Sequence, residues 1–302
     1  MKKRYREQDL NPYAFERNPG KISKTTLEVA RRIRGTGRRP AILIHGVLPR
    51  SGSVYTAQLL ALHPDVHAHP NNIWELPFLR ETAALITLQN RFFRNYNSNA
   101  GKIGNMDFLP LFGAALVSYL YSFVPKGKTM LLKEPDVRFL TYFPLVFPFE
   151  NLLLLMRDGR DLVHSFVNTW PENAFADVCQ RWNWSSRLVL DFYNAYSRTK
   201  RGYWMVKYED IVHEPESLVR EACERFELDP RRYPYKQIRH LKVSGSSSLR
   251  EEGKVTWKAK RRPADFNPIG HWRDWPESDK LIFKDIAGRT LQEAGFSRSA
   301  EW

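Results

Sequence analysis

Four short hydrophobic runs divide the chain and predict buried strands. They cover residues 41–44, 129–132, 152–156 and 203–206, and the third consists of apolar residues in unbroken succession. Continuous apolar runs of this length are typical of parallel strands that are covered on both faces. Segments with apolar residues at helical spacing separate the runs. This alternation predicts an α/β fold with a central parallel sheet of about four or five strands flanked by helices.

The remaining apolar positions predict the helices. Helical spacing covers 25–34, 53–62, 74–93, 177–197 and 277–295; a further helix starts near Asp161, a candidate N-cap, and another at Pro215. The segment 66–72 has neither a helical nor a strand period and is expected to be a loop. Residues 239–268 show little regular pattern, and a loop of that length is usually functional or disordered.

Residues 108–124 carry no charged side chain. This stretch is at the short limit for a membrane-spanning helix and contains Pro110 and Gly113. It also lies between motifs that belong to one site. A helix buried in the protein is therefore the preferred interpretation.

The segment 46–53, between the first predicted strand and its helix, has the composition of an anion-binding loop. Gly52 allows a tight backbone path, Ser51 and Ser53 offer hydroxyls at the helix start, and Arg50 adds a fixed positive charge. The unpaired N–H groups of the first helical turn point at the same place. Gly52 is not followed by the Lys and Ser/Thr of a Walker A loop. The segment is thus either a phosphate-binding loop outside the NTPase pattern or a plain strand-to-helix connection.

Basic residues also stand at the ends of two other predicted strands. Lys133 directly follows the second apolar run, and Arg157 follows the third, with Ser165 eight residues further along. Open α/β sheets bind ligands at the carboxyl ends of their strands, so Arg157 and Ser165 are placed to converge on one phosphate. A surface pairing of Arg157 with Asp158 or Asp161 is the alternative.

The charge balance favours an anionic partner. The 302 residues include 47 Lys and Arg against 33 Asp and Glu, a net charge of +14. Nucleic acid, an acidic lipid surface and a polyanionic cofactor all fit this excess. Basic residues concentrate in the first part of the chain and in 254–262. We expect residues 1–38 to form a basic extension, partly disordered or packed on the domain, and 39–302 to form a single domain.

The chain contains two cysteines, Cys179 and Cys223, and no Cys-x-x-Cys motif. This usage argues against a disulfide framework or a zinc ribbon and favours a reducing compartment. The charged N-terminus is not followed by an apolar region, so no signal peptide is expected. Together these features predict a cytoplasmic protein without a transmembrane segment.

In order and spacing, these motifs resemble those of the sulfotransferases that use 3′-phosphoadenosine 5′-phosphosulfate (PAPS). The likeness runs from about residue 41 to residue 296. Pro49-Arg50-Ser51-Gly52 is similar to the family's phosphosulfate loop, and Gly270-His271-Trp272-Arg273 to its late Gly-x-Trp-basic element. The resemblance is closest to the tyrosylprotein and bacterial small-molecule branches, on the motifs Lys133-Glu134-Pro135, Arg157-Asp158-Gly159-Arg160 and Val163-His164-Ser165.

The resemblance implies roles for individual residues. Lys133 and Arg50 would stabilise the charge that grows on the leaving phosphate, without a metal. Residues 254–262 would form a basic flap over the nucleotide. The residues expected to bind the nucleotide are Arg50, Ser51, Gly52, Ser53, Val54, Arg157, Ser165, Tyr208, Arg261, Arg262 and Gly270.

The family's general base is missing from its expected position. Related enzymes carry a Glu shortly after a His-Pro-Asp-Val helix end; this chain has that end at 63–66 but Pro70, Asn71 or Asn72 where the Glu should fall. The nearby candidates are His67, His69 and Glu75. We favour His69, because an unperturbed imidazole titrates near neutral pH. Alternatively, His69 is an ordinary loop residue and the acceptor needs no strong base.

The resemblance therefore predicts sulfuryl transfer from PAPS by in-line attack, with 3′,5′-ADP as product. The acceptor would be a hydroxyl, or with less support an amine, on a small molecule, lipid, sugar or peptide. Nucleic acid is not expected as a partner, and the oligomeric state is left open. The alternatives are a P-loop kinase or NTPase, which the missing Walker A residues disfavour, and a basic nucleic-acid-binding protein, for which no binding motif is found.

Overall fold

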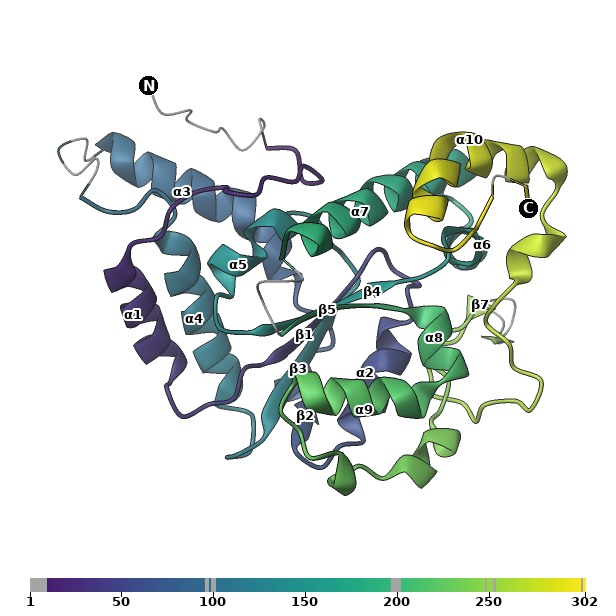
Figure 1. Ribbon diagram of the computed structural model, residues 1–302, viewed down its shortest axis with the longest axis horizontal. Helices are drawn as coiled ribbons and strands as arrows, with labels where there is room; N and C mark the ends of the chain where they lie inside the picture. Colours follow the sequence, from purple (N-terminus) through teal and green to yellow (C-terminus); the bar gives the residue numbers. More distant parts are fainter. Residues whose placement is uncertain are drawn as a thin grey trace.

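The computed structural model describes residues 10–95, 98, 102–196, 202–247, 249–251, 254–299 and 301–302. Its centre is a five-stranded parallel sheet with the strand order β2-β3-β1-β4-β5 (Figure 1). The strands are β1 (Ile42–Gly46), β2 (Val66–Ala68), β3 (Thr129–Glu134), β4 (Asn151–Met156) and β5 (Tyr203–Lys207). The predicted α/β fold is confirmed.

Alternate residues of the inner strands face two separate hydrophobic cores. On β4, Leu152 and Leu154 lie in one core, Leu153 and Leu155 lie in the other, and all four are fully buried. Successive side chains of a strand point to opposite faces, so a strand covered on both faces needs an apolar residue at every position. This is why the sequence shows continuous runs here rather than alternation.

Helices cover both faces of the sheet (Figure 1). On one face lie α2 (Ser53–Ala61), α8 (Tyr208–His213) and α9 (Pro215–Arg225). On the other lie α3 (Thr82–Asn95), α4 (Phe108–Tyr121), α5 (Phe143–Val146), α6 (Gly159–Thr169), α7 (Phe175–Tyr196) and α10 (Glu277–Glu293), with α1 (Lys24–Arg34) packed on α4. The shorter elements are η2 (Pro70–Asn72), η3 (Pro77–Glu81), η5 (Leu140–Tyr142), η6 (Pro230–Arg232), η7 (Tyr235–His240), η8 (His271–Asp274) and the antiparallel pair β6 (Arg250–Glu251) and β7 (Lys254–Val255).

The strand β2 lies in a segment that was expected to be a loop. It pairs with β3 at the sheet edge, with Val66 opposite Thr129 and Ala68 opposite Leu131. Three residues are too few to display a period of two, so only the tertiary pairing reveals the strand.

The helix expected over 74–93 is interrupted. Residues 73–76 have no helical structure, η3 follows, and the regular helix α3 begins only at Thr82. Pro77 disfavours helical geometry at the residue before it, and Leu76 is accordingly extended, with φ −121° and ψ 90°. This interruption leaves Glu75 in an extended segment rather than in a helix.

The start of α6 also differs from the prediction by a few residues. Asp158, rather than Asp161, is the N-cap, and its carboxylate accepts a hydrogen bond from the Arg160 N–H at 2.9 Å. Asp161 lies in the first turn and bonds elsewhere, as described below.

The uncharged segment 108–124 forms α4 and a following turn. One side of α4 packs in the core, while Phe112 and Tyr119 are exposed. Within the described part of the chain, none of the helices has the length and hydrophobicity needed to cross a bilayer.

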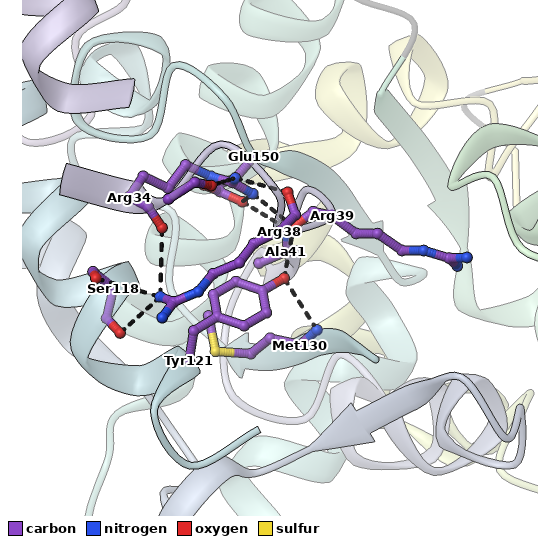
Figure 2. A network of polar contacts seen from close by, with 9 residues as sticks. Arg34, Arg38, Arg39, Ala41, Ser118, Tyr121, Met130 and Glu150 are labelled. Atoms are coloured by element: carbon purple, nitrogen blue, oxygen red, sulfur yellow. Dashed lines mark hydrogen bonds and ion pairs between the residues drawn. The ribbon is translucent and has the colours of Figure 1, made fainter. Parts of the chain in front are cut away.

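A buried polar network fastens the segment after α1 to the beginning of β1 (Figure 2). The Arg34 guanidinium pairs with the Glu150 carboxylate and donates to the carbonyls of Arg38 and Arg39 at 2.9 and 2.6 Å. Glu150 also accepts from the Ala41 N–H at 2.5 Å. The described part of the basic extension is thus joined to the sheet, and the domain boundary at residue 38 stays a prediction.

Candidate functional site

A cavity of about 290 Å³ opens at the carboxyl ends of the central strands. Its walls are the loop after β1, the beginning of α6, Tyr208 after β5, the segment 241–247, and Trp257. Arg50, Arg157 and Ser165 line it as expected, whereas Lys133, the other predicted strand-end residue, does not. Residues over 100 positions apart in the sequence therefore meet in one place.

The loop after β1 has a backbone that only certain residues adopt. Arg50 and Gly52 have φ values of 80° and 91°. A Cβ at Gly52 would lie 2.1 Å from Tyr208 Cδ2, so glycine is needed for the backbone angle and for the close approach of the tyrosine ring. The Ser51 hydroxyl donates to the Leu48 carbonyl at 2.5 Å and accepts from the Leu48 N–H at 3.2 Å. Ser51 thus holds the loop together. Contrary to the prediction, its hydroxyl bonds to Leu48 and Ser51 does not line the cavity.

Two arginines give the cavity its positive charge. Arg50 Nε donates to Ser165 Oγ at 3.1 Å, and Arg157 donates to the carbonyls of Arg50 and Pro268, both at 2.7 Å. Neither guanidinium forms an ion pair with a carboxylate of the described residues. Burial, together with the neighbouring Arg157 charge, lowers the pKa of Arg50 to about 10. Two desolvated cations that repel each other favour an anion between them.

The surface pairing considered for Arg157 does not occur. Asp158 pairs with Arg160 at 2.7 Å. Asp161 accepts from the Gly270 and Trp272 N–H groups at 2.7 and 3.4 Å. Asp161 therefore ties the late Gly-x-Trp element to α6, and brings Pro268 and His271 to the cavity wall.

The other predicted nucleotide residues divide into two groups. Ser53, Val54, Tyr208 and Arg262 line the cavity. Gly270 and Arg261 lie outside its lining, Gly270 as a turn residue with φ 91° and Arg261 as an exposed side chain. The flap expected over 254–262 is represented at the cavity by Trp257 and Arg262, and Trp257 lies 5.7 Å from the Arg50 guanidinium.

Lys133 lies near the carboxyl end of β3, one residue before the strand ends at Glu134, and is 3% exposed. Its Nζ lies 2.7 Å from Glu75 Oε1, and Glu75 is half-exposed and lines the cavity. The Leu76 N–H donates to the Lys133 carbonyl at 3.3 Å, which holds residues 75 and 76 against the strand end. Lys133 therefore reaches the cavity through its carboxylate partner.

His69, the favoured base, does not line this cavity. Its ring packs on Trp74 at 4.2 Å, and its Nδ1 lies 3.3 Å from the Ile73 carbonyl. Burial lowers the pKa of His69 below its usual range. His67 lies on β2 and is likewise absent from the lining. Of the three candidate bases, only Glu75 reaches the cavity.

The placement of Glu75 follows from an unusual backbone. His69, Asn71 and Asn72 have φ values of 54°, 53° and 60°, and three left-handed residues so close together turn the chain back toward β3. Asparagine tolerates this conformation, so the Asn71-Asn72 pair was the available signal. Sequence reasoning also missed His164, His271 and Ser247 as cavity residues; His164 was quoted only as the neighbour of Ser165.

Comparison with known proteins places the chain in a family. The family model described as "Sulfotransferase family" matches residues 40–232, well over half of the chain. The chain belongs to the sulfotransferase family. The family and enzyme class predicted from the motifs are thereby confirmed, and neither alternative class gains support.

Several sulfotransferases are similar in sequence or fold. Protein-tyrosine sulfotransferase A of Caenorhabditis elegans is 22% identical over 86% of this chain and 68% of its own length. Protein-tyrosine sulfotransferase 1 of Danio rerio is 26% identical over 60% of this chain. The match spans about half, 51%, of that relative's own length. The sulfotransferase domain of the Synechococcus PCC 7002 olefin synthase shares the fold, with a TM-score of 0.52, 17% identity and coverage of 94% and 99% of the two chains.

The expected cytoplasmic location is wrong. The sequence relatives are named protein-tyrosine sulfotransferases, and enzymes of that kind act on secreted proteins rather than in the cytoplasm. The expectation relied on the cysteines. Cys179 and Cys223 are buried, free thiols, and two unpaired buried thiols are compatible with a reducing or an oxidising compartment.

Proposed function

We propose that this sulfotransferase moves a sulfuryl group from PAPS to an acceptor hydroxyl and releases 3′,5′-ADP. The observation that carries the proposal is the pair Arg50 and Arg157, two cations without a carboxylate partner among the described residues, in the cavity that Glu75 also lines. The cavity thus combines charge for a bis-phosphorylated donor with a carboxylate for the acceptor.

The donor would lie across the two arginines. The N–H groups of the first turn of α2 and the Arg50 guanidinium would hold the 5′-phosphosulfate, because a helix N-terminus and a buried cation both favour an anion. Arg157 and Ser165 would hold the 3′-phosphate. Tyr208 and Arg262 would contact the rest of the nucleotide, and Arg261 keeps this role only on the family resemblance.

Glu75 replaces His69 as our proposed base. In the reaction the acceptor oxygen attacks sulfur, the bond from sulfur to the phosphate oxygen breaks, and the acceptor proton passes to the Glu75 carboxylate. Lys133 lies beside that carboxylate and would stabilise the negative charge that grows on the leaving phosphate. The paired charges keep both side chains oriented before substrates bind.

The acceptor that best fits is a phenolic hydroxyl. The relatives are named for protein tyrosine, and Trp170 and Trp257 give the cavity an aromatic wall, with ring centroids 6.4 Å apart. Trp182 and Trp184 do not line the cavity: Trp182 is fully buried and Trp184 is exposed.

The test is a transfer assay with ³⁵S-labelled PAPS and three acceptor classes: a tyrosine-containing peptide, a small phenol and an aliphatic alcohol. We expect label in the phenolic acceptors and equal release of 3′,5′-ADP. The Arg50→Ala/Arg157→Ala variant is the control for transfer by a contaminant. A parallel assay uses ATP that is radiolabelled in its γ-phosphate. Transfer of that label to the acceptors, with no transfer from PAPS, would contradict the proposal.

A further inference from the structure

His164 lies next to Ser165 on α6 and lines the cavity. Its Nδ1 accepts a hydrogen bond from Trp275 Nε1 at 3.2 Å. An indole N–H can only donate, so Nδ1 carries a lone pair and the proton of the neutral ring is on Nε2. No residue that the structure describes bonds to this Nε2, which leaves its N–H available to a ligand in the cavity.

His271 fixes the orientation of the His164 ring. The two rings stack with centroids 5.6 Å apart and planes at 12°. His271 Nε2 donates to the Asn267 carbonyl at 2.7 Å, so its own position is set by the loop before η8. Two contacts, the Trp275 hydrogen bond and the His271 stack, therefore hold the His164 imidazole.

The charges around His164 favour the neutral ring. Arg157 lies on the segment before α6, Asp161 on α6 itself and Asp274 on η8, and Asp161 is bonded to two backbone N–H groups. Burial, His271 and Arg157 lower the pKa of His164 and outweigh the opposing effect of the two carboxylates.

We propose that His164 is a neutral hydrogen-bond donor to the 3′-phosphate of the bound nucleotide, in the Nε2–H tautomer that Trp275 fixes. The inference rests on the proposed function, since it assigns a further ligand to the same donor. The arginines attract any phosphate, whereas a fixed N–H beside Ser165 recognises a phosphate at one position. His164 would thus help the enzyme select 3′-phosphorylated nucleotides, with Trp275 as its positioning residue.

The test compares the affinities of 3′,5′-ADP and of adenosine 5′-phosphosulfate, which lacks the 3′-phosphate, by calorimetry. His164→Asn should bind 3′,5′-ADP at least about tenfold more weakly, the scale of one hydrogen bond to a charged group, while the second nucleotide is little affected. His164→Gln should restore most of the affinity, because its amide nitrogen reaches the position of Nε2.

The role of Trp275 is tested by pH. Trp275→Phe keeps the ring packing but frees Nδ1 to take a proton, so between about pH 8 and 6.5 the variant should gain several-fold in 3′,5′-ADP affinity relative to wild type. Trp184→Phe makes the same chemical change on the surface of α7 and should follow wild type. Histidine ¹⁵N spectra of the wild-type protein should show the Nε2–H tautomer of His164 throughout this range.

The outcomes separate the two proposals. If the wild-type protein does not bind 3′,5′-ADP, the proposed function fails. If it binds, but His164→Asn binds equally well or loses both nucleotides equally, the assignment of His164 to the 3′-phosphate is overturned. A protonated His164 in the wild-type spectra, or wild-type behaviour of Trp275→Phe with pH, would overturn the fixed tautomer.

Discussion

Lys133 Nζ and Glu75 Oε1 lie 2.7 Å apart where β3 ends, although 58 residues separate them in the chain. The lysine is buried and the carboxylate is half-exposed at the cavity, so the pair presents its acidic member to an acceptor. This placement is the reason that we propose Glu75 for the role of the family carboxylate that is missing from its expected sequence position.

Glu75→Gln should lower kcat by about a hundredfold or more, because the amide cannot take the acceptor proton. Binding of 3′,5′-ADP should not change. His69→Ala serves as the matched control and should keep both the rate and its pH profile, since His69 is outside the cavity lining. Initial-rate assays with PAPS check both variants; a larger loss in the histidine variant would return the base to His69.

Lys133→Ala should also lower the rate by about a hundredfold, the scale of losing one donor to a transition-state oxyanion. Lys133→Arg should not recover it, because a planar guanidinium places its charge elsewhere. As Lys133 and Glu75 act as a pair, the double variant should lose less than the sum of the single free-energy losses. Strict additivity in this cycle would show that the pair does not work as a unit.

Gly52→Ala should both destabilise the protein and abolish nucleotide binding, because its Cβ meets the Tyr208 ring in a left-handed backbone. Gly127→Ala is a suitable control: Gly127 has φ 82°, yet nothing lies within 4 Å of its Cβ position. That control isolates the backbone strain, of about 1–3 kcal/mol. Equal unfolding free energies and intact binding in both variants would exclude the predicted clash.

Glu150→Ala should destabilise the fold by about 3–5 kcal/mol, because it leaves the Arg34 guanidinium buried without its partner. The loss should appear in denaturant unfolding as a lower midpoint. Glu221→Ala removes an exposed ion pair with Arg225 on α9 and should cost less than about 1 kcal/mol. Similar midpoints for the two variants would contradict the structural importance of the network in Figure 2.

The sequence alone predicted the elements that have a clear local pattern of apolar residues. The runs that form β1, β3, β4 and β5 are apolar at nearly every position because two cores cover them, and their ends carry Arg50, Lys133 and Arg157 as expected. The edge strand β2 was missed because three residues carry no period and its pairing is made by a segment far along the chain.

The sequence named Glu75 as one of three candidate bases but favoured His69, because position in the motif does not show which side chain reaches the cavity. The position of Glu75 is set by three left-handed residues, by Pro77, which keeps the residue before it out of a helix, and by the hydrogen bond from the Leu76 N–H to the Lys133 carbonyl. His164 depends on Trp275, which follows it by more than 100 residues. Local sequence patterns predict neither the position of Glu75 nor the hydrogen bond between Trp275 and His164. The Asn71-Asn72 pair and Pro77 do indicate a turn and a helix break before Glu75 and after it.

We propose above all that Arg50 and Arg157 form a site for a nucleotide phosphorylated at both its 5′ and 3′ positions. The most direct measurement is the melting temperature with 3′,5′-ADP or ATP, in the wild-type protein and in Arg157→Ala. A ligand that binds only the folded state raises this temperature with the logarithm of its concentration over Kd. We expect 3′,5′-ADP to raise the melting temperature clearly and ATP to raise it much less. Arg157→Ala should lose most of the rise with 3′,5′-ADP. Equal rises with both nucleotides in the wild-type protein would contradict this proposal.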